Sequence, residues 1–212
     1  LYHLALGLRW GANQAALARG EKRPEINWAE AVNHLPLQTA LDSIETKSKF
    51  VADTLKHSSY DEFWQKMSIR NDYPEMDVPA FHITGWYDDL VQETIRNFTG
   101  MRKASRSNNA RRWQRLLIGP WGHGIGQNSQ YGDVDFGEQA ILDPIKIQTE
   151  WFDHHLKNKN NLENDFPVRI FVMGKNEWRN ESEWPLSRAQ PTRLFLRSAN
   201  SANTRFGDGR LD

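Results

Sequence analysis

The class of fold is decided by residues 78–89, which read VPAFHITGWYDD. The first seven form a short apolar run that ends at Gly85, as is typical of a buried strand in a parallel sheet. Residues 91–101 then place Val, Thr, Ile, Phe and Met on one helical face, and a second apolar run, WQRLLI at 113–118, ends at Gly119. Strand, helix and strand, followed by a long loop and another helix, predict an α/β fold with a parallel sheet between helices.

The helix that follows the long Gly- and Asn-rich loop has a recognisable start. Asp143 is suited to cap its first turn, and the next residue is a proline, which fits the first helical position. Ile145, Phe152 and Leu156 are spaced to give this helix a buried face.

The flanking parts of the chain have a different character. Residues 1–75 show helical spacing without strand-like alternation. After a polar linker at 157–165, residues 167–173 and 192–196 alternate as strands do, which predicts the entry to an all-β domain. The chain opens in mid-helix and closes on a turn, so both ends are expected to be cut. The predicted domains are a helical region at 1–75, an α/β part at 76–160 and a truncated β part at 161–212.

Composition excludes several classes of protein. The 212 residues carry 27 basic and 27 acidic side chains, so neither a nucleic-acid partner nor a polybasic membrane contact is expected. The chain has no cysteine, which rules out disulfides and thiolate metal sites. No apolar run approaches the roughly 20 residues that span a bilayer.

Reactive side chains follow both predicted strands, Asp88 after the first and His123 after the second. Because the carboxyl ends of parallel strands meet at one edge of a sheet, the two are expected to lie together. The carboxylate would accept the ring N–H and fix the tautomer of the imidazole, as in a catalytic acid–base pair. Two other interpretations stay open at this point: Asp88 or Asp89 caps the following helix, and His123 is a solvated loop residue.

Other side chains are weaker candidates. Trp86 and Trp121 each neighbour a candidate catalytic residue, and they are the predicted substrate contacts. His82 lies inside a strand and is expected to pack in the core. The adjacent His154 and His155 point in different directions around a helix, so they are not expected to share a metal ion.

A nucleophile is missing from this set. A nucleophile elbow needs Gly-x-Ser-x-Gly at a strand-to-helix turn, where small neighbours tolerate the strained backbone. None of the 12 serines has these neighbours. In α/β-hydrolases the serine precedes the acid, which precedes the histidine, so the serine is expected upstream of Leu1.

Five motifs follow one another along the chain in the order of a known family. They are Gly85-Trp-Tyr-Asp88, Ile118-Gly-Pro-Trp-Gly-His123, Trp151-Phe-Asp153 with Leu156-Lys157, Val168-Arg-Ile-Phe-Val-Met-Gly174, and Glu177-Trp-Arg179 with Trp184-Pro-Leu186. Together they resemble the CocE/NonD hydrolases, a group that includes cocaine esterase and glutaryl-cephalosporin acylases and is related to the Xaa-Pro dipeptidyl-peptidases. The resemblance extends from about Tyr60 to Leu211.

The resemblance implies an α/β-hydrolase domain that is interrupted by a helical cap and followed by a jelly-roll β-domain. Residues 1–75 would be most of the cap, 76–160 the second half of the hydrolase domain and 161–212 the start of the jelly roll. It also implies that Asp88 and His123 are the triad aspartate and histidine. The serine of the family and its oxyanion-hole tyrosine have no counterpart here, and a glycine at 122 replaces the usual serine before the histidine.

The implied reaction is hydrolysis of a small ester or amide through a serine of the intact enzyme, with no metal or organic cofactor. The chain alone is expected to be inactive. The alternative is a non-catalytic remnant, a β-sandwich binding module attached to a degenerate hydrolase half. The upstream sequence distinguishes the two, since an intact Gly-x-Ser-Tyr-x-Gly supports the enzyme, and Ala or Gly in place of the serine supports the remnant.

Overall fold

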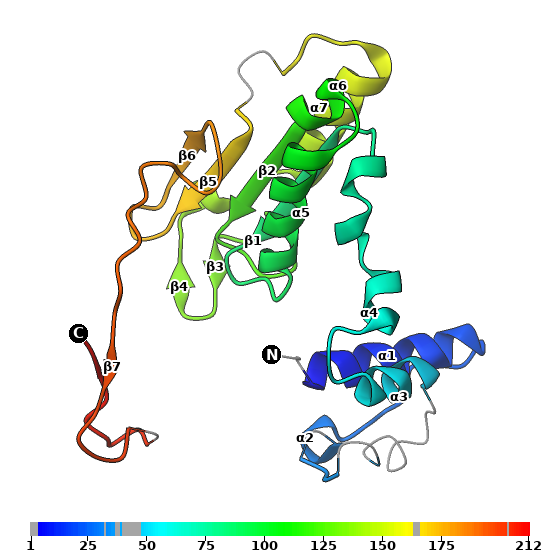
Figure 1. The fold of residues 1–212 in the computed structure, drawn as a ribbon, viewed down its shortest axis with the longest axis vertical. Helices are drawn as coiled ribbons and strands as arrows, with labels where there is room; N and C mark the ends of the chain where they lie inside the picture. The colour runs from blue at the N-terminus through cyan, green and yellow to red at the C-terminus, as the bar shows by residue number, and fades with distance from the viewer. Residues whose placement is uncertain (1–3, 32, 37–38, 40–47, 163–165, 203) are drawn as a thin grey trace.

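The computed structural model describes residues 4–31, 33–36, 39, 48–162, 166–202 and 204–212 (Figure 1). A central sheet carries the helices of the middle of the chain, a group of N-terminal helices lies apart from it, and an extended C-terminal segment leaves on the other side. The helices are α1 (Leu4–Ala18), α2 (Trp28–Ala31), α3 (Lys49–Lys56), α4 (Glu62–Met67), α5 (Val91–Ala104), α6 (Asn108–Arg112) and α7 (Pro144–Lys157), with 3₁₀ turns η2 (Ile69–Asn71), η3 (Tyr73–Glu75) and η4 (Glu138–Ala140). The strands are β1 (Ala80–Gly85), β2 (Gln114–Gly119), β3 (Gln130–Tyr131), β4 (Val134–Asp135), β5 (Val168–Val172), β6 (Glu177–Glu181), β7 (Leu196–Arg197) and β8 (Arg210–Leu211).

The central sheet has the strand order β1-β2-β5-β6. The first three strands run parallel, and β6 is antiparallel to β5. Phe98 of α5 contacts His82 of β1, whereas Trp151 of α7 contacts Phe81 of the same strand. Because successive residues of a strand point to opposite faces, α5 and α7 cover opposite sides of the sheet. The predicted α/β class is confirmed, with a mixed sheet in place of a purely parallel one.

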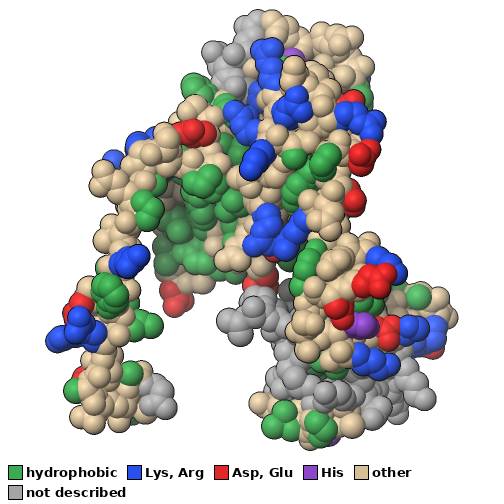
Figure 2. Space-filling view, in the orientation of Figure 1, with side chains coloured by type: hydrophobic (Ala, Val, Ile, Leu, Met, Phe, Trp, Pro, Cys, Tyr) green, Lys and Arg blue, Asp and Glu red, His purple; other side chains and the backbone are tan. Residues whose placement is uncertain are grey.

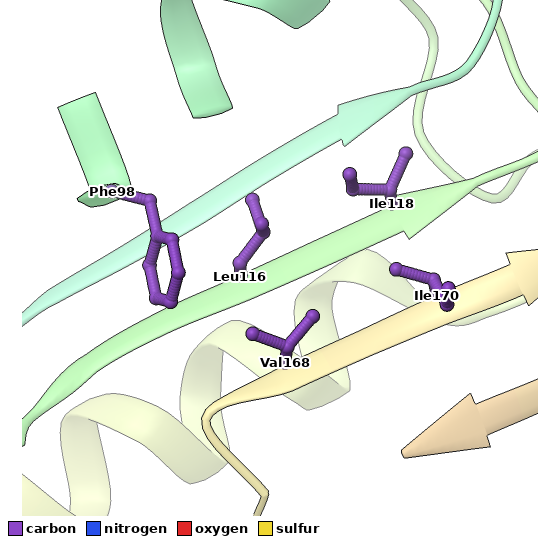
Figure 3. Close-up of a cluster of buried hydrophobic side chains, with 5 residues drawn as sticks. All are labelled: Phe98, Leu116, Ile118, Val168 and Ile170. Carbon is purple, nitrogen blue, oxygen red and sulfur yellow. The ribbon is translucent and has the colours of Figure 1, made fainter. Parts of the chain in front are cut away.

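The main core lies between α5 and the sheet. Figure 3 shows Phe98 from α5 against side chains from alternate positions of two neighbouring strands, all of them buried. These are Leu116 and Ile118 from β2, and Val168 and Ile170 from β5. Each such side chain stabilises the fold by about 1.5–3 kcal/mol when it is removed from water. The cluster therefore fixes β5 beside β2 as well as holding α5 in place.

Strand β5 belongs to the central sheet. The alternation of apolar residues at 167–173 predicted the entry to an all-β domain. In the structure β5 pairs in parallel with β2, from Leu116 opposite Val168 to Ile118 opposite Ile170. A short apolar strand looks the same in sequence whichever sheet receives it, so the pattern did not distinguish the two cases. The strand expected at 192–196 is reduced to β7, which pairs with β8 outside the central sheet. A jelly roll after β6 stays a prediction.

Helix α7 begins as predicted, since Asp143 accepts hydrogen bonds from backbone N–H groups of its first turn. The predicted buried face is wrong. Ile145, Phe152 and Leu156 are exposed, and Trp151 is the residue that α7 buries. At about 100° per residue, the three exposed side chains share one side of the helix, roughly 100° or more from Trp151. The spacing identified a real apolar stripe but not the face that meets the sheet.

The described residues of the N-terminal part form helices joined by loops and include no strand, in keeping with the helical spacing of the sequence. α1 and α3 pack together through Leu8 and Val51, and Ser48 caps α3 by accepting the N–H of Val51. The helical spacing expected from Leu1 onward begins in residues 1–3, which lie outside the described residues. Among the residues that the structure describes, no helix has the length and apolar character needed to cross a membrane.

The segment between these helices and β1 docks on α5. The hydroxyl of the buried Tyr73 donates to the side-chain oxygen of Asn97 at 2.8 Å. Arg70 donates to both carboxylate oxygens of Glu93 at 2.8 and 2.7 Å. The Tyr73 ring lies against Gly100, where an added methyl group would come within 2.1 Å of a ring carbon. The absence of a side chain at Gly100 therefore permits this contact.

We expect Gly100→Ala to destabilise the protein by about 1–3 kcal/mol, because the buried ring of Tyr73 must move to admit the methyl group. Without that contact the change would stabilise a helix by about 1 kcal/mol. The free energy of unfolding in urea measures the effect. In a Tyr73→Ala background the clash is absent, so Gly100→Ala should cost nothing there. An equal loss in the free energy of unfolding in both backgrounds would show that the contact with Tyr73 is not the cause.

Candidate active site

The loops that follow β1 and β2 leave the sheet side by side. The two strands are in register up to their last residues, Gly85 and Gly119. Beyond that pair, the backbone N–H of Trp86 donates to the carbonyl of Gly119 at 2.8 Å, and that of Tyr87 donates to the carbonyl of Trp121 at 3.0 Å. Main-chain hydrogen bonds thus join the two loops past the end of the strands.

Gly85 makes this close approach possible. A methyl group at this position would lie 1.9 Å from the carbonyl oxygen of Trp121, far inside van der Waals contact. Any larger residue would push the second loop away from the first. The glycine that ends the first apolar run therefore sets the distance between the loop of Asp88 and the loop of His123.

Asp88 is shielded and held by neighbouring groups. Its side chain is 9% exposed. The carboxylate accepts the N–H of Leu90 at 2.9 Å and the hydroxyl of Thr84 at 3.2 Å. Nδ1 of His123 lies 3.3 Å from both of its oxygens. The capping interpretation is not confirmed for Asp88, because the N–H that it binds belongs to Leu90, which precedes α5, and among the described residues no side chain caps this helix.

His123 presents its ring to solvent, with 80% of the side chain exposed. With a proton on Nδ1 facing Asp88, the imidazole keeps a lone pair at Nε2 for a proton from a hydroxyl group. A shielded carboxylate beside an exposed imidazole is the arrangement that general acid–base chemistry requires. The structure brings the two predicted residues together, and their catalytic role stays a prediction.

A second Asp–His pair serves a local purpose. Nδ1 of His57 lies 2.5 Å from a carboxylate oxygen of Asp61, four residues further along the same segment. Asp61 also accepts the N–H of Phe63 at the start of α4, and the His57 ring stacks on the Phe63 ring. The hydrogen bond from His57 lowers the pKa of the Asp61 carboxyl. This pair fastens a helix end, and it lies in the N-terminal part, not at the strand ends.

The predicted tryptophans have structural partners. The indole N–H of Trp86 donates to the carbonyl of Phe171 on β5 at 2.8 Å. The indole N–H of Trp121 donates to the carbonyl of Ala140 at 2.7 Å, and its ring packs on Trp178. Trp121 is only 3% exposed, so its ring has a packing role. Trp86 is half-buried, and substrate contact by its ring stays a prediction.

The remaining histidines on the central part of the chain pack against neighbours. Burial lowers the pKa of His82, whose Nε2 hydrogen-bonds to the side-chain oxygen of Gln114 at 2.8 Å. His154 and His155 both lie against the ring of Trp113. Within the described ranges, no group of three or more His, Cys, Asp or Glu side chains is placed to hold a metal ion.

Sequence reasoning missed two residues beside the pair. Thr84 donates to Asp88 from the penultimate position of β1. Tyr131 stacks on Tyr87, with ring centroids 4.4 Å apart and planes at 23°. Tyr131 lies in the hairpin of β3 and β4, whose two-residue Gly-Asp connection is a signal that could have revealed it. In the part of the chain that the structure describes, no serine hydroxyl bonds to His123.

The surface beside the pair is apolar. Leu90, close to Asp88, and Val134, in the β3–β4 hairpin, are exposed around the ends of the strands. Figure 2 shows hydrophobic side chains gathered in a hollow beside α5, over β5 and toward β3 and β4. Such a surface favours ligands that carry an apolar group.

Comparison with known proteins identifies a family and several relatives of this chain. Residues 1–125 match the X-Pro dipeptidyl-peptidase (S15) family, a span that includes both strand ends and both members of the Asp–His pair. The chain belongs to this family. The resemblance to the CocE/NonD hydrolases is also confirmed, because this S15-family chain is similar to cocaine esterase from Rhodococcus sp. (strain MB1 Bresler). The two are 34% identical over 167 residues, which make up 76% of this chain and 27% of the esterase.

Two solved structures share the fold of this S15-family chain. An aminopeptidase from a marine sediment Thaumarchaeota archaeon has a TM-score of 0.64 at 22% identity, and the match covers 99% of this chain and 34% of that one. An α-amino acid ester hydrolase has a TM-score of 0.54 at 22% identity, with coverages of 74% and 24%. The chain therefore spans about a quarter to a third of the length of these relatives.

Proposed function

We propose that this chain supplies the general base and its orienting acid to a serine hydrolase that cleaves small esters or amides. The observation that carries the proposal is the pairing of Asp88 with His123 beyond the ends of two adjacent parallel strands. The acid precedes the histidine in the chain, as it does in α/β-hydrolases. Membership of the S15 family supports hydrolysis as the type of reaction.

In the proposed reaction, His123 takes the proton of a serine hydroxyl at Nε2 while the serine oxygen attacks the substrate carbonyl. Asp88 holds the proton on Nδ1 and stabilises the imidazolium, without taking up a proton itself. His123 then passes its proton to the leaving alcohol or amine. Water repeats the sequence on the acyl-enzyme, which releases the acid and restores the serine.

The nucleophile is proposed to lie outside these 212 residues. None of the 12 serines has the glycine neighbours of an elbow, and the chain spans 27% of cocaine esterase. In the longer protein, residues 1–75 would form part of a cap, and the hydrolase part would run from about 76 through β6. The segment after β6 would lead into a further β-domain.

The substrate is proposed to be a small molecule with an apolar group next to an ester or amide. Exposed apolar side chains beside His123 support the apolar group. Two of the relatives are named for ester hydrolysis and one as an aminopeptidase, which supports both bond types. Of the two predicted tryptophans, Trp86 is the one that keeps surface for such a contact. Neither a nucleic acid nor a membrane has a part in this proposal.

The test compares this chain with a longer protein that also contains the upstream region, using p-nitrophenyl acetate. The chain alone is expected to release nitrophenol no faster than buffer, and the longer protein is expected to lose its activity to a serine-directed sulfonyl fluoride. Hydrolysis by the chain alone that His123→Ala abolishes would contradict an external nucleophile. An upstream elbow with Ala or Gly for serine, together with no turnover, would establish the non-catalytic alternative.

A further inference from the structure

The hydrogen bond to Asp88 is too weak to position His123 alone. Both Nδ1–oxygen distances are 3.3 Å, whereas charge-assisted bonds of this kind are about 2.7–2.9 Å. The ring is mostly exposed, and glycines flank the residue at 122 and 124. Since glycine gives the backbone wide freedom beyond the main-chain bond at Trp121, a contact further along the loop is needed to hold His123 against Asp88.

Tyr131 makes that contact. Its ring stacks on Tyr87, the residue before Asp88, at 4.4 Å between centroids. Tyr87 also packs against Phe136, which is buried. The β3–β4 hairpin, which follows the His123 loop in the chain, thus folds back to touch the loop that carries the acid. The stack links the two loops on a side where their main-chain hydrogen bonds have ended.

The same ring also lies against the residue before His123. A methyl group on Gly122 would come within 2.7 Å of a ring carbon of Tyr131 and 3.1 Å of its hydroxyl oxygen. Gly122 is not in the left-handed backbone region, so its conformation does not itself demand glycine. The ring of Tyr131 is what excludes a side chain there. By contrast, a methyl group on Gly124 would meet nothing within 4 Å.

We propose that Tyr131 is a positioning residue, whose ring, seated on Gly122 and stacked on Tyr87, holds His123 against Asp88. This inference rests on the proposed function, because positioning matters for turnover only if the Asp–His pair is catalytic. Tyr131 acts through the loop and has no proton-transfer role. Its aromatic ring is therefore the part that counts, and its hydroxyl is dispensable.

Turnover of p-nitrophenyl acetate by the longer hydrolase gives the first test. Tyr131→Ala and Gly122→Ala are each expected to lower kcat about 3- to 10-fold with little change in KM, the range that loss of an aromatic pair implies. Tyr131→Phe and Gly124→Ala should stay near the wild-type rate. The double variant Gly122→Ala/Tyr131→Ala should be no slower than Tyr131→Ala, because the methyl group has nothing left to displace. Losses that multiply in the double variant would overturn the proposal.

The tautomer of His123 gives a test that does not depend on activity. Nitrogen-15 chemical shifts of its ring nitrogens, measured on the longer protein with labelled histidine, distinguish a proton on Nδ1 from one on Nε2. We expect the wild type and Tyr131→Phe to keep the proton on Nδ1, and Tyr131→Ala and Gly122→Ala to shift it toward Nε2. Thermal melts identify any variant that unfolds. If Tyr131→Ala or Gly122→Ala unfolds, the tautomers of Tyr131→Phe and Gly124→Ala decide the question, because both are expected to keep the proton on Nδ1. Unchanged tautomers in all variants would overturn the positioning role, whereas normal turnover in His123→Ala would overturn the proposed function alone.

Discussion

Replacing His123 with alanine is expected to lower kcat of the proposed serine hydrolase by about 10³- to 10⁴-fold. The methyl side chain cannot take the proton of the attacking hydroxyl, so the serine remains a weak nucleophile. KM should change little, because an exposed imidazole beside the reacting bond contributes little to ground-state binding. Steady-state hydrolysis of p-nitrophenyl acetate measures both constants.

The matched control is His57→Ala. His57 also pairs with an aspartate, at 2.5 Å, but it does so within the N-terminal helical region. Its loss should leave turnover within about twofold of the wild type. It should lower stability slightly, because His57 holds Asp61, which caps the start of α4. Comparable losses of turnover in both variants would show that the assay reports folding, and near-normal turnover in His123→Ala would remove this residue from the mechanism.

Asp88→Asn is expected to lower kcat by a similar factor, about 10⁴-fold, with the fold intact. Asparagine keeps the size of the side chain and an oxygen that can accept the N–H of Leu90. Its amide N–H groups, however, favour the imidazole tautomer that carries its proton on Nε2, which cannot accept the proton of the serine. Pre-steady-state acylation should slow by the same factor as kcat if acylation limits the rate.

Asp61→Asn is the corresponding control. Asp61 holds His57 and caps α4, so this variant alters an Asp–His pair of similar chemistry away from the strand ends. We expect normal turnover from it. Activity retained in Asp88→Asn at the level of Asp61→Asn would leave Asp88 with a structural role only, through its bonds to Leu90 and Thr84.

The meeting of Asp88 and His123 followed from the sequence because it depends only on topology. Two short apolar runs on either side of a helix predict neighbouring parallel strands, and their carboxyl ends must then share an edge. The main-chain bonds from Trp86 and Tyr87 are a further consequence of that register. None of this needed knowledge of how distant side chains pack.

The errors concern contacts that no local pattern encodes. The spacing of Ile145, Phe152 and Leu156 marks a stripe but does not say which side of α7 meets the sheet, and Trp151 does so instead. Strand β5 was assigned to the all-β part because an alternation of apolar residues does not show which strand it pairs with. The contact of Tyr131 with Gly122 could not be predicted for the same reason, because it depends on how the ring of a hairpin residue packs against the backbone of a loop.

The close approach of Gly85 to the carbonyl of Trp121 has a consequence for how such proteins can vary in length. An inserted or deleted residue between β1 and Asp88, or between β2 and His123, would shift one partner along the chain and break the register of the pair. The stretch from Gly124 to Ser129 is free of that constraint at its start, because space around Gly124 is open. Insertions that preserve the Asp88–His123 pair and the contact of Tyr131 with Gly122 should therefore be tolerated best beside Gly124, and the two short connections before Asp88 and His123 should keep a constant length.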